Sequence, residues 1–182
     1  MKKLRRVIAG IDEKGVSRFT ADEEIEAVTP PTLGTDIIQI FGSDQQLTVP
    51  YDGKPAEGLR FFPKDASGFR FIIFTYPAKA SPHQLTDDPA AHAETERLTP
   101  GIGEAVSGSG GMHATATVDL EYVISGELTL ILDSGERKVL RAGDCLVQCG
   151  TQHAWLNEGD EPATMLLVFI GVNQDVSRFP AV

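Results

Sequence analysis

The sequence lacks any long hydrophobic run. No stretch of its 182 residues approaches the roughly 18 apolar residues that a membrane helix needs, so we expect no membrane partner. The N-terminal segment MKKLRRVIAG begins like a signal peptide, but its apolar run is too short and Asp12 ends it. A cytoplasmic location is therefore the expectation.

Cysteine and net positive charge are also lacking. Cys145 and Cys149 are the two cysteines, and on one strand they would lie about 13 Å apart, beyond the ~7 Å that a disulfide allows. We predict reduced thiols that are buried as small hydrophobic side chains. The net charge of −10 disfavours nucleic acid as a partner, because an acidic surface repels phosphate groups.

Phosphate-binding loops, serine-hydrolase elbows and zinc-finger spacings are absent as well. The sequence contains instead a succession of strand-like runs joined by turns rich in glycine and aspartate. Short strands are also expected within residues 1–34. The clearest runs lie at 35–41, 68–78, 115–124, 127–133, 137–142, 144–149, 152–157 and 163–170. This pattern predicts an all-β barrel or sandwich.

One segment departs from the strand pattern. DDPAAHAETERL reads as a helix, with Asp88 as its N-cap and Pro89 in its first turn. The long stretch 79–112 around it is typical of a functional loop. We expect His83 and His92, which lie in this stretch, at the surface.

Two histidines and a carboxylate stand out between residues 111 and 157. His113 precedes one strand-like run, Asp119 lies within it, and His153 lies in another. Two imidazoles and a carboxylate are a ligand set for a transition metal. By strand alternation, the side chains of one face are His113, Thr115, Thr117, Asp119 and Glu121.

The opposite face of the same run is apolar. It carries Val118, Leu120, Tyr122 and Ile124. If the polar set lines a barrel interior, this outer face is too apolar to meet water. We expect it to pack against the N-terminal segment or a second subunit, and we predict a homodimer.

The block 111–157 resembles the two motifs of the cupin superfamily, in particular small single-domain cupins of the cupin 2 conserved-barrel type. His113 stands at the first histidine of the first motif, Asp119 stands where the family has glutamate, and Thr115 replaces the second histidine. The remaining matching positions are Gly126, Gly143, Gly150, His153 and Asn157. The resemblance implies a double-stranded β-helix, or jelly roll, with a metal or ligand site inside its open end.

The resemblance also gives the expected organisation of the chain. Residues 1–182 would form a single cupin domain with one peripheral helix. Residues 1–67 would be an N-terminal strand extension with the first strands, and residues 68–171 the conserved barrel. Residues 79–112 would form a lid-like helix and loop over its mouth.

The site expected from this reading has three parts. A divalent metal (Fe, Zn, Ni or Mn) would be held by His113, Asp119 and His153. Glu121 is a rival carboxylate and, with the Thr115 hydroxyl, a catalytic candidate. The substrate pocket would be walled by Thr117, Trp155, Asn157, Tyr76 and Arg70.

Three functions remain open from the sequence. The first is a divalent-metal-dependent enzyme of dioxygenase, decarboxylase or lyase type that acts on a small organic acid or phenolic compound. The second is a metal-free small-molecule-binding or sensory protein without catalysis. The third is a dehydratase or isomerase in which Asp119 or Glu121 is the general base and His113 or His153 the acid.

Overall fold

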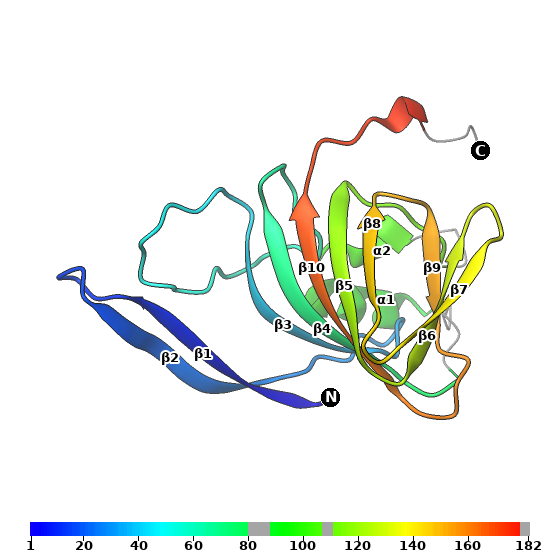
Figure 1. The fold of residues 1–182 in the computed structure, drawn as a ribbon, viewed down its shortest axis with the longest axis horizontal. Coiled ribbons are helices and arrows are strands. Elements are labelled where there is room, and N and C mark those ends of the chain that lie inside the picture. The colour runs from blue at the N-terminus through cyan, green and yellow to red at the C-terminus, as the bar shows by residue number, and fades with distance from the viewer. Residues whose placement is uncertain (80–87, 107–110, 179–182) are drawn as a thin grey trace.

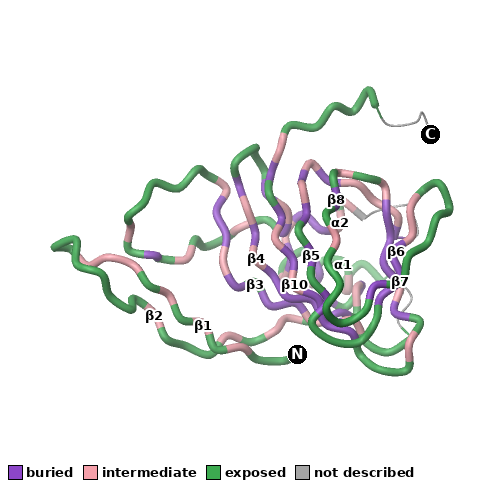
Figure 2. Tube along the Cα trace, viewed as in Figure 1, coloured by how far each residue is buried: buried purple, intermediate pink, exposed green. Residues whose placement is uncertain are grey.

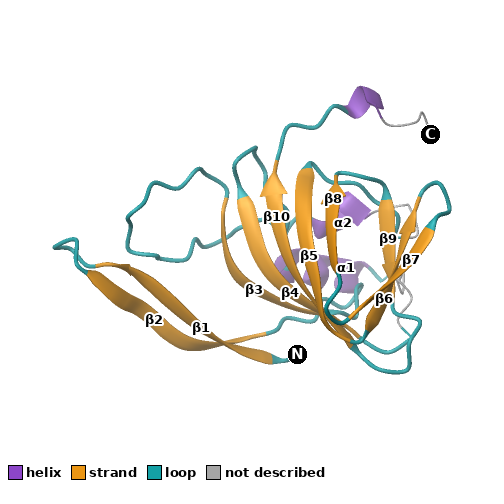
Figure 3. Ribbon diagram, in the orientation of Figure 1, coloured by secondary structure: helices purple, strands orange, loops and turns teal. Residues whose placement is uncertain are grey.

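The structure is a computed structural model that describes residues 1–79, 88–106 and 111–178. Figure 1 shows two sheets facing each other, a strand hairpin that projects from them, and two helices on the far side. Strands dominate the fold (Figure 3). The all-β prediction is therefore confirmed.

The larger sheet contains five antiparallel strands in the order β3–β4–β10–β5–β8. Each predicted run from residue 35 onward is a strand, with bounds close to those expected. The strands are β3 (Asp36–Ser43), β4 (Phe69–Tyr76), β5 (Thr117–Ser125), β8 (Cys145–Cys149) and β10 (Ala163–Gly171).

The smaller sheet contains three antiparallel strands in the order β7–β6–β9. They are β6 (Glu127–Leu132), β7 (Arg137–Arg141) and β9 (His153–Leu156). Gly126 makes the turn from β5 into β6 with a φ of 74°. A Cβ there would lie 2.7 Å from the Pro162 carbonyl oxygen, so glycine is required both for the backbone angle and for the space.

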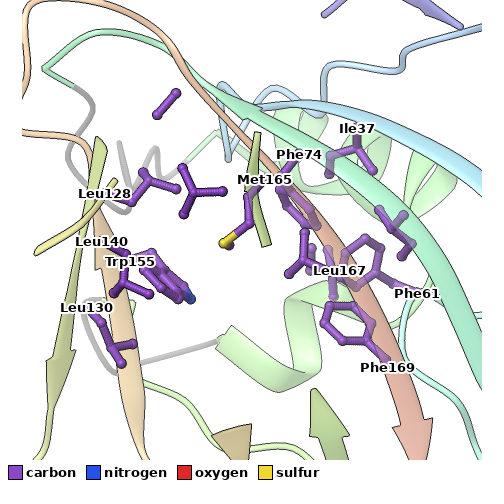
Figure 4. Packing of buried hydrophobic residues seen from close by; sticks show 14 residues of the cluster. Ile37, Phe61, Phe74, Leu128, Leu130, Leu140, Trp155, Met165, Leu167 and Phe169 are labelled. Atoms are coloured by element: carbon purple, nitrogen blue, oxygen red, sulfur yellow. The ribbon is translucent and has the colours of Figure 1, made fainter. Parts of the chain in front are cut away.

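The core lies between the two sheets. It gathers side chains from both, and its labelled members in Figure 4 are Ile37, Phe61, Phe74, Leu128, Leu130, Leu140, Trp155, Met165, Leu167 and Phe169. Strand β5 alternates as predicted, because Thr117, Asp119, Glu121 and Val123 are buried while the residues between them are not. The polar face of β5 is thus its inner face.

The first 26 residues contain the strands expected there, which are longer than predicted and pair as a hairpin. Strand β1 (Lys3–Ile11) pairs with β2 (Ser17–Glu26), and the hairpin projects away from the two sheets (Figure 1). Its base packs on the outer side of the larger sheet, where Leu4 and Ile25 contact a second cluster of Ile38, Ile40 and Ile73.

Two helices flank the core. Helix α1 (Pro89–Leu98) begins as predicted, with the Asp88 side chain accepting a hydrogen bond from the Ala90 backbone N–H. Helix α2 (Ile102–Val106) follows it, and a short 3₁₀ helix lies at Val176–Arg178.

His92 on α1 is exposed, as predicted, while His83 lies outside the described residues. Within the described part of the chain, neither α-helix is long and apolar enough to cross a membrane.

The cysteines are free thiols, as predicted, but the prediction that they are buried was wrong. Cys145 and Cys149 are free and exposed, because β8 ends the larger sheet and both side chains point to its outer side. Val147 between them is 61% exposed. Sequence alternation showed correctly that the two thiols share a face, but that face is not covered within this chain.

The outer face of β5 carries the apolar side chains that were predicted to pack against the N-terminal segment or a second subunit, and this face continues onto β8. Leu120, Tyr122 and Ile124 are each at least 40% exposed, and Figure 2 shows exposed (green) stretches along β5 and β8. We expect Val147→Glu to convert a dimer into a monomer in light scattering, because a charge on this face would stay desolvated in an interface. Val139→Glu on β7, 43% exposed in the wild type, is the matched control. A monomeric wild type at tens of micromolar would contradict the prediction.

Candidate functional site

A cavity of about 80 Å³ lies between the two sheets. A single water needs only about 10–15 Å³ of such space, so several waters or one compact organic molecule fit. The wall is mostly apolar and aromatic. Its residues are Leu33, Thr35, Phe61, Phe62, Phe74, Tyr76, Ile102, Gly111, His113, Asp119, Glu121, His153, Trp155, Leu167 and Phe169.

The structure places His113 and His153 side by side in this wall. Their backbones exchange two hydrogen bonds of 2.9 Å in an isolated antiparallel bridge, and their ring centroids lie 4.3 Å apart. The Nδ1 atom of His113 lies 2.8 Å from the Gly111 carbonyl oxygen, and that of His153 lies 2.9 Å from the Thr151 carbonyl oxygen. A carbonyl accepts only from a protonated nitrogen, so each Nε2 atom keeps its lone pair.

Both imidazoles are neutral at pH 7. Burial lowers the pKa of His113, although the Gly111 carbonyl opposes this shift. Burial and then the neighbouring His113 lower the pKa of His153 to about 4. The cavity therefore presents two neutral hydrogen-bond acceptors on this side.

Asp119 and Glu121 form a second pair of titratable groups in the wall. Both residues are less than 5% exposed. Asp119 Oδ1 and Glu121 Oε2 are buried without a hydrogen-bond partner among the described residues. A buried polar atom without a partner is costly, so a ligand or water in the cavity would stabilise both groups.

The two carboxyl groups differ in pKa. Burial raises the pKa of Asp119 to about 6, and a hydrogen bond from Thr117 limits the shift. Burial and then the charge of Asp119 raise the pKa of Glu121 to about 8. At neutral pH this pair contains one carboxylate and one carboxylic acid, which suits a base and an acid. Burial and Glu121 also raise the pKa of Tyr76, so its hydroxyl stays protonated.

The predicted three-ligand metal set is only partly assembled. In the described part of the chain, no three side chains of histidine, cysteine, aspartate or glutamate come together as a metal-binding group. His113 and His153 are close together with free Nε2 lone pairs, but Asp119 does not join them. The residues present therefore fit a two-histidine site and do not fit the predicted triad.

Two of the predicted pocket residues have other partners. Arg70 is 0% exposed, and its guanidinium binds main-chain carbonyls and the Asp44 carboxylate. The Asn157 amide donates to the carbonyls of Pro77 and Glu161 at 3.0 and 2.9 Å. Neither side chain lines the cavity. Trp155 and Tyr76 do line it.

Thr115 and Thr117 lie on the same inner face but outside the cavity wall. Their hydroxyl oxygens are hydrogen-bonded to each other at 2.6 Å, and both line a separate open hollow near the C-terminal segment. The Thr115 hydroxyl is thus not among the groups that surround the cavity.

Several wall residues were not identified from the sequence. Phe61 and Phe62 come from the irregular segment between β3 and β4, where no alternation indicates which side chains point inward. Phe62 lies beside His113, with ring centroids 6.3 Å apart. Ile102 on α2 and Gly111 also reach the wall, so part of the predicted lid segment borders the cavity.

Comparison with known proteins agrees with the fold and motifs. A family model for the cupin domain matches residues 104–169. Phomopsin biosynthesis cluster proteins C′ and D of Diaporthe leptostromiformis are each 37% identical over 95 residues, 45% of this chain and 50% of each relative. Cupin-domain-containing oxidoreductase fogC of Aspergillus ruber is 33% identical over 89 residues, 47% of this chain and 44% of that protein. The alignments thus span about half the length of these relatives.

A solved structure shares the overall arrangement of strands. The Cnp3 cupin domain of Schizosaccharomyces pombe matches with a TM-score of 0.50 over 92% of this chain and 87% of that chain. The sequence identity is 8%, so this likeness concerns the fold alone.

Proposed function

We propose that this chain, a member of the cupin superfamily through its Cupin_2-type domain, binds a small uncharged phenolic or related aromatic molecule and transfers protons on it. The observation that carries the proposal is the pair of buried carboxyl groups, Asp119 and Glu121, with unpartnered oxygens in an otherwise aromatic cavity. This is the dehydratase or isomerase function predicted from the sequence. Asp119 is again the base, but Glu121 takes the place of a histidine as the acid.

The charge of the cavity favours a neutral ligand over an organic acid. No lysine or arginine is among the wall residues that the structure describes, and Arg70 is held by other groups. An anionic ligand would meet Asp119 and two uncharged imidazoles, with no cation to offset its desolvation. A phenolic hydroxyl can instead donate to a histidine Nε2 atom, while its ring contacts the aromatic wall.

The roles of the two carboxyl groups follow from their protonation. Asp119 is mostly ionised at pH 7 and would accept a proton from a carbon next to a carbonyl or hydroxyl-bearing carbon. Glu121 is mostly protonated and would donate a proton to the oxygen. In an isomerisation the oxygen is retained, and in a dehydration it leaves as water. Proton exchange with solvent then resets both groups, and neither reaction needs an oxidant.

The test uses neutral and charged probes of one shape. We expect 4-ethylphenol to bind measurably in calorimetry and 4-hydroxybenzoate to bind at least tenfold more weakly.

We also expect the protein to catalyse deuterium exchange at the methyl group of acetophenone, and Asp119→Asn to reduce that rate by about 10²–10⁴-fold. Glu57→Gln, on an exposed loop, is the control. Stronger binding of the carboxylate would refute the neutral-ligand proposal, and exchange that survives in Asp119→Asn would refute the role of this base.

A metal-supported oxidoreductase role is the second candidate. It is favoured by the adjacent histidine rings with free Nε2 atoms and by relatives that are named cupin-domain-containing oxidoreductases. A bound divalent metal would supply Lewis-acid or redox chemistry at the two histidines.

Metal titration distinguishes the two-histidine site from the predicted triad. Because Asp119 stands apart from the histidines, we expect Asp119→Asn to change the affinity for Zn²⁺ or Ni²⁺ by less than about threefold. His153→Ala should reduce it by at least about tenfold, since it removes one of two ligands. Calorimetric titration of the purified protein measures both. A large loss in Asp119→Asn would instead restore the triad that the sequence predicted.

A further inference from the structure

Gln148 is a buried polar residue that neighbours one member of each titratable pair, Asp119 by strand register and His153 by a side-chain contact. It lies on β8, is 3% exposed, and sits directly opposite Asp119 in the antiparallel register of β5 and β8. Its amide nitrogen also contacts Nδ1 of His153. One buried side chain thus adjoins a member of each pair, although it does not line the cavity itself.

The contact between Gln148 and His153 is chemically mismatched in this orientation. His153 Nδ1 lies 2.9 Å from the Thr151 carbonyl oxygen, so it carries a proton. An amide NH₂ group cannot donate to a nitrogen that is itself a donor. Meanwhile, Gln148 Oε1 is buried without any hydrogen-bond partner among the described residues.

A rotation of the amide by 180° removes this mismatch. The rotation exchanges the oxygen and the nitrogen within the same volume. Gln148 Oε1 then faces His153 Nδ1 and accepts its proton, sharing it with the Thr151 carbonyl. The NH₂ group moves to the place of the unpartnered oxygen and now needs an acceptor.

Asp119 supplies that acceptor. Directly opposite residues of an antiparallel pair have Cβ atoms about 4.5–5.5 Å apart, within reach of a glutamine and an aspartate side chain. Asp119 Oδ1 is itself a buried acceptor without a partner. Two acceptors that face each other form no hydrogen bond, whereas an amide NH₂ that faces a carboxyl oxygen does.

We propose that Gln148 is a positioning residue that links Asp119 to His153, its Oε1 accepting from His153 Nδ1 and its Nε2 donating to Asp119 Oδ1. The link satisfies both Gln148 Oε1 and Asp119 Oδ1 with a single rotation. It holds His153 in the tautomer that keeps the Nε2 lone pair available, and it fixes the orientation of the Asp119 carboxyl group. The effect of this link on a reaction rate rests on the proposed function, whereas the two hydrogen bonds do not depend on it.

Neutron diffraction on crystals of the deuterated wild-type protein tests the link directly. We expect deuterium on the Gln148 amide atom that faces Asp119, and none on the atom that faces His153. Deuterium on the atom that faces His153 would overturn the proposal. This measurement needs no substrate, so its outcome is independent of whether the protein exchanges protons on acetophenone.

Two variants test the consequence for His153 and for the reaction. Gln148→Glu keeps an acceptor for His153 Nδ1, whereas Gln148→Leu removes it. In long-range ¹H–¹⁵N spectra, we expect the Nδ1-protonated tautomer in the wild type and in Gln148→Glu, and a mixture of tautomers in Gln148→Leu. Acetophenone exchange should fall about tenfold in maximal rate in Gln148→Leu, with its half-saturating concentration unchanged.

The control is Gln39→Leu, at an exposed position of β3. It should leave both the tautomer and the exchange rate unchanged. An unchanged tautomer in a folded Gln148→Leu protein would show that the Thr151 carbonyl alone positions His153, and this would overturn the positioning role. An inactive wild type with the expected neutron map would refute the proposed function and leave the link intact.

Discussion

Arg70→Met is expected to lower the free energy of unfolding by about 3–5 kcal/mol, as removal of one member of a buried ion pair does. The Arg70 guanidinium is fully buried. It donates to the carbonyls of Arg60, Ser43 and Phe69 at 2.7–2.9 Å and forms an ion pair with Asp44. Methionine fills similar volume but leaves these acceptors without a donor.

Urea denaturation of the variant and the wild type measures this loss. Arg137→Met is the matched control, because Arg137 forms an ion pair with Glu158 at the surface, and such pairs contribute about 0–1 kcal/mol. The folded fraction of Arg70→Met should bind 4-ethylphenol as the wild type does. A stable variant that loses binding would place Arg70 in the substrate pocket, as the sequence predicted.

Alternation along single strands was the most reliable guide from the sequence. It placed Asp119 and Glu121 on one inner face of β5, as observed. Alternation does not say how far along a strand a cavity extends. Arg70 and Tyr76 lie at opposite ends of β4, about 20 Å apart at ~3.3 Å per residue. Of these two residues, only Tyr76 lines the cavity.

Other features depend on contacts between strands. The bridge between His113 and His153 is an isolated pairing between the first residue of β9 and a residue outside the strands. The exposure of Cys145 and Cys149 follows from the place of β8 at the end of its sheet. The position of Gln148 opposite Asp119 follows from the register of β5 and β8. Since no local pattern encodes these pairings, the sequence indicated the histidines and carboxylates but not how they are grouped.

Glu121→Gln should stabilise the protein at alkaline pH. The pKa of Glu121 rises from 4.5 to about 8 on folding, through burial and then through the charge of Asp119. Between these two values the folded protein binds more protons than the unfolded chain, so stability falls as the pH rises. Glutamine has nearly the shape of the protonated acid and never ionises. We therefore expect similar stabilities at pH 5 and a variant more stable by roughly 3 kcal/mol at pH 9.

The histidines affect stability in the opposite direction and at lower pH. Because folding lowers the pKa of His153 from 6.5 to about 4, the unfolded chain binds more protons in that window, and stability is lost as the pH falls through it. Urea denaturation from pH 4 to pH 9 should therefore show the His153 and Glu121 contributions opposing each other below about pH 6.5, and a decline in wild-type stability due to Glu121 between about pH 6.5 and 8. In Glu121→Gln the alkaline decline should be weakened while the acid decline remains, and in Glu57→Gln both should remain. An alkaline decline of full size in Glu121→Gln would mean that Glu121 ionises freely in the folded protein. In that case Glu121 could not serve as the proton donor proposed here.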